Sequence, residues 1–193
     1  MEEKQYQVKQ DSFARSQTEI ITEPVFPSIS GEVWAILKDN DTGKEEKIYI
    51  GKNVITVGAS ILIARLLKDA TSTNGLLYLS VGTGALGWNL QNPPAATSQQ
   101  TQLEAELFRK SFSKTAFIKT DGSGDESTIP TNIVDYTTTF AEAEAVGPLV
   151  EMGLYGGDAT GVPNSGALFN YRTFPVINKS PNSTLTLVWR ITT

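Results

Sequence analysis

Residues 184–191 read TLTLVWRI, and this stretch indicates most clearly how the chain folds. Side chains of a β-strand point alternately to its two faces, so every second residue shares a face. Leu185, Leu187 and Trp189 therefore fall on one face, and Ile191 continues it, whereas the residues between them are mostly polar. Such alternation is typical of a strand that buries one face in a core.

Similar short apolar stretches run from Asn53 to this last strand, separated by segments rich in Gly, Pro and Asn. Residues 76–81 and 134–140 are two examples. Residues 107–119 indicate another strand, with a bulge or bend near Phe117 because the aromatic side chains change parity there. Many short strands joined by turn-rich loops predict a β-sandwich or jelly-roll-like body.

A hairpin and a helix complete the expected elements. Residues 31–38 and 47–55 flank the turn-forming segment DNDTGKEE, which predicts a β-hairpin. Residues 57–70 have apolar side chains at helical spacing. The expected fold is therefore mainly β, with one short helix at about 57–70. The side chains expected on the buried face of this helix are Ile61, Leu62, Leu66 and Leu67.

The first 28 residues differ from the rest, because they are polar and have no sustained apolar period. We expect residues 1–28 to form an extended N-terminal arm and residues 29–193 to form the β-sandwich body. An arm of this kind contacts a partner through its few large apolar side chains. The candidate contact residues in the arm are Tyr6, Phe13, Ile20 and Phe26.

The amino-acid composition limits the kinds of catalytic and metal-binding site that the chain can form. The 193 residues include no Cys and no His, which removes disulfides, thiolate nucleophiles and the commonest general base and transition-metal ligand. We therefore expect no enzyme, no cofactor and no small-molecule substrate. Sixteen basic against 21 acidic residues give a net charge of −5, which argues against nucleic-acid binding. The basic clusters at 109–114 and 44–52 are interpreted as solvated strand faces.

Three motifs could suggest phosphate binding, cation binding or a catalytic carboxylate pair, but each has a simpler explanation. Gly82-Thr83-Gly84 follows a predicted strand, but no GK[ST] motif follows it, so it is interpreted as a tight turn. The acidic loop at 121–128 is interpreted as a solvated tip rather than a cation site. Glu142 and Glu144 alternate with alanines, which predicts a solvent-facing pair on one strand.

Residues 85–100 and 156–166 are expected to be long loops, the second of them flexible. Trp88 lies in the first loop and is the candidate partner contact in the body, although a ring folded back onto the body is the favoured interpretation of the two. The charged N-terminal sequence is unlike a signal peptide, and no apolar stretch approaches the length of a membrane span. We expect a protein made in the cytoplasm, without a membrane partner.

The order of the blocks resembles a family of tailed-bacteriophage virion proteins. The resemblance covers about residues 52–193 and implies a β-sandwich structural subunit of the particle, on the capsid shell or in the tail, without catalytic or cofactor residues. The matching blocks are residues 53–67, 81–84, 103–110, 151–155, 168–175 and 184–191.

This resemblance predicts a non-enzymatic virion protein that is assembled in the host cytoplasm, forms homo-oligomers and contacts the major capsid protein or other virion proteins. A capsid decoration or cement protein is the leading hypothesis, and a tail, neck or fibre-adaptor component is the alternative. A carbohydrate-binding module is a further alternative, with Trp34, Trp88 and Trp189 as sugar platforms. Trp34 and Trp189, however, fall on strand positions expected to face the core.

Overall fold

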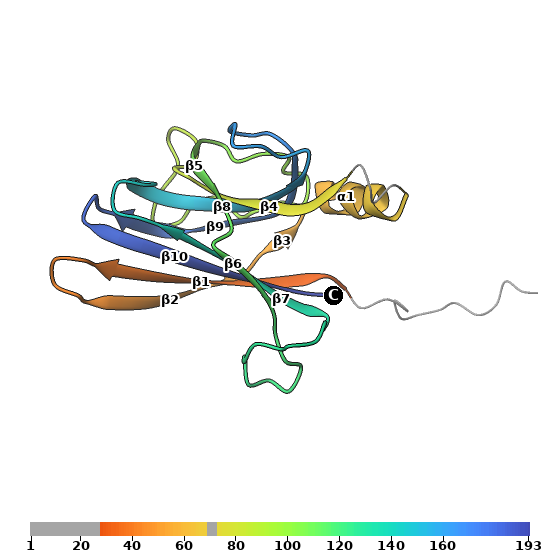
Figure 1. Cartoon of the computed structure of the whole chain (residues 1–193). Coiled ribbons are helices and arrows are strands. Elements are labelled where there is room, and N and C mark those ends of the chain that lie inside the picture. The colour runs from red at the N-terminus through yellow and green to blue at the C-terminus, as the bar shows by residue number, and fades with distance from the viewer. Residues whose placement is uncertain (1–27, 69–72) are drawn as a thin grey trace, which may run out of the picture.

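The alternating stretch near the C-terminus forms strand β10 (Ser183–Thr192), and it lies at the centre of a sheet. Leu185, Leu187 and Trp189 are buried, while the residues between them are partly exposed, as the sequence predicts. The computed structural model describes residues 28–68 and 73–193. Within these ranges the strands form two five-stranded antiparallel sheets that lie face to face (Figure 1).

Sheet I has the strand order β2-β1-β10-β7-β6 and sheet II the order β3-β9-β8-β4-β5. Sheet I thus places the predicted hairpin beside the C-terminal strand. The other strands of sheet I are β1 (Ser30–Asp39), β2 (Glu45–Lys52), β6 (Lys114–Phe117) and β7 (Ile133–Phe140). Those of sheet II are β3 (Val54–Ile55), β4 (Asn74–Gly82), β5 (Glu106–Ser111), β8 (Gly147–Gly157) and β9 (Ala167–Lys179).

The main core lies between the two sheets. Val33 and Trp189 enter it from sheet I, and Met152 and Leu154 enter it from sheet II, all without solvent exposure. Burial of aliphatic and aromatic side chains on this scale is the dominant favourable term in folding. The predicted mainly-β fold with one short helix is confirmed.

Sheet II also buries side chains on its other face, away from sheet I. Leu103, Tyr155, Leu168 and Tyr171 form this second, smaller cluster. Two segments cover it, residues 83–105 and 158–166, which we call the loop layer. Figure 1 shows these loops above sheet II, on the side opposite sheet I. The molecule therefore has three layers in this region, and the loops contribute to a core.

Helix α1 (Val57–Lys68) packs at the end of sheet II against β9, and it is the single helix among the described residues. Its predicted continuation to residue 70 lies outside those residues. Leu62 is buried, but Ile61 and Leu67 are exposed, so the predicted buried face is only partly correct. Gly58 permits the close approach, since a Cβ atom there would lie 2.3 Å from the Leu168 carbonyl oxygen.

Two predicted strands divide between the sheets. Residues 107–119 are not one bent strand: β5 belongs to sheet II and β6 to sheet I, with the crossing at Phe112 and Ser113. The predicted hairpin forms from β1 and β2, but Val54 and Ile55 leave it and pair with β9 as β3. No helix within residues 28–68 and 73–193 is long and apolar enough to span a membrane.

Candidate functional site

Glu151 anchors the loop layer to sheet II. Its side chain lies on β8 and has no solvent exposure. Oε1 accepts hydrogen bonds from the backbone N–H groups of Gly84, at 3.1 Å, and Ala105, at 2.8 Å. Oε2 accepts from the Glu104 N–H at 3.0 Å and from the Tyr171 hydroxyl at 2.6 Å. A buried acidic group is stable only when its oxygens are hydrogen-bonded. Here the donors come from both ends of the 83–105 loop, so the carboxylate closes that loop.

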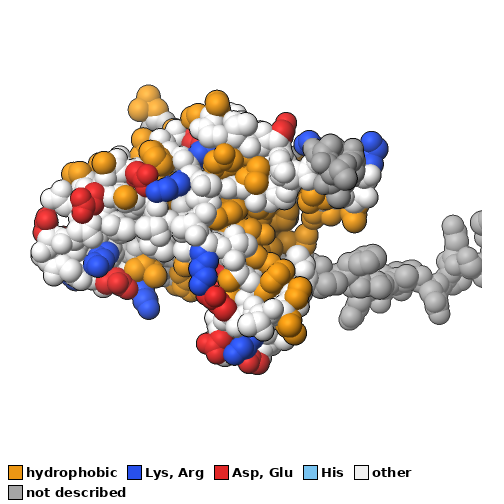
Figure 2. All heavy atoms as spheres, in the orientation of Figure 1, with side chains coloured by type: hydrophobic (Ala, Val, Ile, Leu, Met, Phe, Trp, Pro, Cys, Tyr) orange, Lys and Arg blue, Asp and Glu red, His pale blue; other side chains and the backbone are white. Residues whose placement is uncertain are grey.

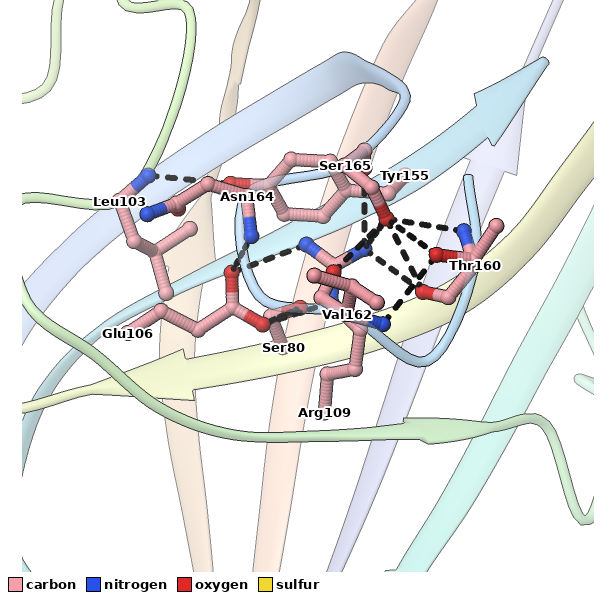
Figure 3. Close-up of polar contacts among 9 residues, drawn as sticks. All are labelled: Ser80, Leu103, Glu106, Arg109, Tyr155, Thr160, Val162, Asn164 and Ser165. Atoms are coloured by element: carbon pink, nitrogen blue, oxygen red, sulfur yellow. Dashed lines mark hydrogen bonds and ion pairs between the residues drawn. The ribbon is translucent and has the colours of Figure 1, made fainter. Parts of the chain in front are cut away.

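A buried ion pair fixes the other loop (Figure 3). Arg109 Nε lies 2.6 Å from Glu106 Oε1, and both side chains are only 1% exposed. The Arg109 Nη1 atom donates to the Thr160 and Ser165 carbonyl oxygens at 3.0 and 2.9 Å. The Asn164 N–H donates to Glu106 Oε2 at 2.7 Å. Both charged groups thus bond to backbone atoms of the 158–166 loop.

Aromatic rings complete the surroundings of this ion pair. The Arg109 guanidinium lies 4.3 Å from the centre of the Tyr155 ring, a cation–π contact in a desolvated place. The Tyr155 hydroxyl accepts a hydrogen bond from the Leu103 N–H at 3.0 Å, which links the pair to the first loop. The prediction of a solvated strand face is therefore wrong for Arg109. The loop that the sequence predicts to be flexible is held by hydrogen bonds to the Arg109 and Glu106 side chains.

Burial raises the pKa of both tyrosines in this region. Loss of solvent is the main cause for Tyr155 and for Tyr171, and the hydrogen bond to Glu151 raises the pKa of Tyr171 further. Both phenols therefore stay protonated to a higher pH than the phenol of an exposed tyrosine does. The Tyr171 hydroxyl is thereby kept as a hydrogen-bond donor to the carboxylate, which strengthens the connection between β9, β8 and the loop.

Trp88 folds back onto the start of the first loop and is half-buried. Gly84 has a φ of +71°, and a Cβ atom there would lie 2.4 Å from Trp88 Cε3. The ring also lines an open cavity of about 720 Å³ between the loop and residues 172–175 of β9. The interpretation of Trp88 as a ring tucked onto the body describes its position best, although part of it remains accessible.

The loop layer carries several of the exposed large apolar side chains of the described residues. Leu86 is fully exposed, Leu90 is partly exposed and Val162 is 65% exposed. The contacts of Glu151, Glu106 and Arg109 hold other residues of the same two loops, at 84, 104–105, 160 and 164–165. The Val176 N–H of β9 donates to the Leu90 carbonyl oxygen at 2.8 Å. Chemically, the polar groups of this site hold two loops in one arrangement and leave aliphatic side chains facing solvent.

Lys179 makes a comparable anchor at the other end of β9. Its Nζ atom donates to the carbonyl oxygens of Ala141, Glu142 and Ser183 at 2.7–3.1 Å. Burial lowers the pKa of this amine, and the nearby carboxylates of Glu144 and Glu142 oppose the shift. Residues 141–145 form a turn between β7 and β8, so the prediction of a glutamate pair on a strand is wrong.

The acidic loop after β6 uses its side chains locally. Hydrogen bonds from the Ser123 side chain and from the Ser123 N–H lower the pKa of Asp121. Asp125 pairs with Lys119, and Glu126 pairs with Lys114. Across residues 28–68 and 73–193, no three His, Cys, Asp or Glu side chains come together in a way that could hold a metal ion.

The three tryptophans differ from one another in environment. Trp189 is fully buried, as predicted, and its Nε1 lies 3.3 Å from Asn53 Oδ1. Trp34 is predicted to face the core, and this prediction is wrong. Its neighbours Val33 and Ala35 point inward with no exposure, so Trp34 lies on the outer face of sheet I. There its ring centre is 5.7 Å from that of Tyr49.

Of the predicted contact residues, Tyr6, Phe13, Ile20 and Phe26 lie outside the described residues, and Trp88 lies in the loop layer. The sequence reasoning missed Glu151 and Arg109. A signal was present for Glu151, because a single acidic residue interrupts the apolar run LVEMGLY of residues 149–155. An acidic residue inside a buried strand requires several donors, and the sequence does not say where they are.

Comparison with known proteins gives no information on the role of Glu151, Glu106 and Arg109, so their role is inferred from the contacts above. No protein-family model and no curated protein matches this chain. Three of the blocks on which the phage resemblance rests nevertheless meet at one place in the structure. Residues 81–84, 103–110 and 151–155 supply Glu151, most of its donors and the Glu106–Arg109 pair.

Proposed function

We propose that this chain is a non-enzymatic structural protein of a bacteriophage particle, and specifically a capsid decoration or cement protein that bridges capsid subunits. The phage assignment comes from the sequence resemblance. The observation that carries the structural role is the loop layer, where buried polar groups fix two loops and aliphatic side chains remain exposed on them.

Exposed aliphatic side chains on fixed loops favour association. Binding costs conformational entropy when an interface must be ordered, and a surface that is already ordered avoids much of that cost. Leu86 and Val162 lie on opposite loops of the layer, and each offers apolar area that a partner can remove from water. The proposed partners are the major capsid protein and further copies of this chain.

A protein present in many copies on a symmetric shell can bind it stably even if each single contact is weak. Each contact contributes little affinity, but linked contacts act together through a high effective concentration. This argument favours a shell protein over a component present in few copies. The alternative function, a tail, neck or fibre-adaptor component, uses the same loops against tail proteins.

The copy number in purified particles distinguishes the two locations. Quantitative mass spectrometry against the major capsid protein should give on the order of hundreds of copies for a shell protein, and about six or twelve for a closed ring in the tail. Absence of the protein from purified particles would overturn both versions of the proposal.

The loop layer is tested by binding to particles that lack this protein. We expect Leu86→Ser and Val162→Ser to weaken co-sedimentation with the particles. Ile129→Ser is the matched control, because Ile129 is 67% exposed, as Val162 is 65% exposed, but lies in the loop between β6 and β7. Equal binding by all three variants would show that the loop layer is not the contact surface.

A further inference from the structure

We propose that the outer face of sheet I, around Trp34 and Tyr49, binds a neutral carbohydrate through one pyranose ring. This site is separate from the loop layer, because it lies on the opposite sheet and shares no residue with the Glu151 and Arg109 contacts. The inference goes beyond the assembly role and does not rest on it.

The aromatic pair is produced by strand pairing. Trp34 of β1 lies opposite Val188 of β10 on one side and Tyr49 of β2 on the other. All three point away from the core, since Ala35 and Trp189 occupy the inward positions beside them. The Trp34 and Tyr49 rings are tilted by 46°, and Tyr49 is 56% exposed. Two aromatic side chains on an outer sheet face are available to a ligand.

Beside the pair is a shallow recess of about 260 Å³. Its floor is apolar, formed by Trp34, Ile36 and Val188, and Lys47, Asp135 and Arg190 stand around it. Sites for small molecules combine an apolar lining with a few placed polar groups, and those for drug-sized ligands are about 300–1,000 Å³. A recess just below that range suits a ligand of one ring better than an extended peptide.

The polar groups in and beside the recess are already positioned. Arg190 donates two hydrogen bonds to Asp135, at 2.8 and 2.9 Å, and its guanidinium lies 5.4 Å from the centre of the Trp34 ring. The Tyr49 hydroxyl donates to Glu32 at 3.3 Å. Groups held in this way lose little freedom when a ligand arrives, which favours binding.

The charges around the recess select the class of ligand. Asp135, Lys47 and Arg190 line the recess, and Glu32 lies beside it, where it accepts the Tyr49 hydrogen bond and faces Arg190. The two carboxylates balance the two cations, so a charged ligand gains little net attraction. A neutral ligand that both donates and accepts hydrogen bonds can use the acidic and the basic side chains that line the recess. Sugar hydroxyls do both, as the hydroxyl groups of side chains do. The C–H face of a pyranose offers apolar area to the Trp34 ring.

The test uses the full-length chain and an array of neutral oligosaccharides with gluco-, galacto- and manno-configured pyranose rings. Each bound oligosaccharide is then titrated by isothermal calorimetry. We expect Trp34→Ala to weaken binding at least about ten-fold, as truncation of an aromatic anchor does. Trp88→Ala is the matched control and should bind as the unaltered chain does, because Trp88 lies in the loop layer over sheet II, away from this recess.

Two further variants keep the test conclusive if Trp34→Ala does not fold. Tyr49→Ala removes the exposed ring that pairs with Trp34, and Lys47→Ala changes an exposed side chain that lines the recess. Both should weaken binding several-fold while the melting temperature is retained. Lack of binding to every neutral oligosaccharide would overturn the proposal, and so would unchanged binding by Trp34→Ala and Tyr49→Ala.

Measurements of binding to particles distinguish the carbohydrate proposal from the proposed assembly role of the loop layer. If the carbohydrate proposal holds, Trp34→Ala co-sediments normally with particles, while Leu86→Ser does not. If Trp34→Ala loses particle binding and no oligosaccharide binds, the face docks a protein and the carbohydrate proposal fails. Loss of oligosaccharide binding leaves the copy number in particles unchanged, so the two proposals can fail independently.

Discussion

The hydroxyl of Tyr171 donates a 2.6 Å hydrogen bond to Oε2 of Glu151, across the strand pair β9 and β8. Neither group is exposed, and the same carboxylate holds three backbone N–H groups of the loop layer. A single acidic side chain therefore connects two strands of sheet II with the loop that covers them. Its removal should affect the loop more than the sheets.

Glu151→Gln should lower the free energy of unfolding by about 3 kcal/mol, because the amide nitrogen cannot accept the hydrogen bonds that one carboxylate oxygen accepts. Urea denaturation measures this loss. Hydrogen exchange should become faster at the Gly84, Glu104 and Ala105 amides. Glu45→Gln, on exposed strand β2, is the control and should change neither quantity. Unaltered exchange at these amides in Glu151→Gln would contradict the role of Glu151.

Arg109→Met should release the 158–166 loop and lower the free energy of unfolding by about 3–5 kcal/mol, because it leaves the buried Glu106 without its partner. Limited proteolysis should then cut within this loop before it cuts elsewhere. The double variant Arg109→Met with Glu106→Leu should recover part of the lost stability, since no buried charge is left unpaired. A double variant less stable than Arg109→Met would show that the hydrogen bonds, rather than the charges, dominate.

The protein should lose stability at alkaline pH through Tyr155 and Tyr171. Their pKa values are raised above 10.0, so unfolding releases protons at high pH, and the stability present below pH 10.0 is lost as the pH rises further. Each tyrosine contributes about 1.4 kcal/mol per pH unit. The lowered pKa of Lys179 has the opposite effect, but only below its usual value of 10.5.

Urea midpoints measured above pH 10.5 should therefore isolate the two tyrosines. Tyr171→Phe should be less stable than the unaltered chain at neutral pH, because it loses the hydrogen bond to Glu151, yet it should show a shallower decline with pH. Tyr155→Phe should also decline less steeply. If both variants decline as steeply as the unaltered chain, neither phenol is responsible.

Gly84→Ala and Gly43→Ala should differ in effect although both glycines have a φ of +71°. The shared backbone strain costs about 1 kcal/mol in each. At Gly84 the new methyl group also meets Trp88 and Val150, whereas at Gly43 no atom lies within 4 Å. We expect Gly84→Ala to cost about 1–3 kcal/mol more and to shift the Trp88 fluorescence. Equal costs would mean that the Trp88 ring moves away without loss of packing.

Deletion of residues 1–28 tests the predicted arm, of which residues 1–27 lie outside the described residues. The β-sandwich core is built from residues after Ser28, so the melting temperature should change little. Binding to particles that lack the protein should be lost if the arm crosses a neighbouring subunit. Undiminished binding by the shortened chain would exclude this role for Tyr6, Phe13, Ile20 and Phe26.

Local patterns predict the strands well because burial of one face imposes a period of two. The alternation in residues 184–191 is reproduced residue by residue in β10. In β1, apolar residues occupy both faces, as Val33 and Trp34 illustrate, and the sequence does not show which of them enters the core. The pairing of the strands decides it, because Val33 lies directly opposite the inward-facing Trp189 and residues paired across two strands share a face of the sheet.

The candidate site was less predictable, because it too depends on contacts between residues far apart in the sequence. Glu151 and its donors are separated by 46 residues at Ala105 and by 67 at Gly84, and a hydrogen bond over such a distance leaves no local period. The sequence by itself determined the mainly-β body, its hairpin and its single described helix, since these depend on neighbouring residues. Only the tertiary structure decided that Arg109 is buried, that the loops form a layer and that Trp34 faces solvent, because long-range pairing sets each of these environments.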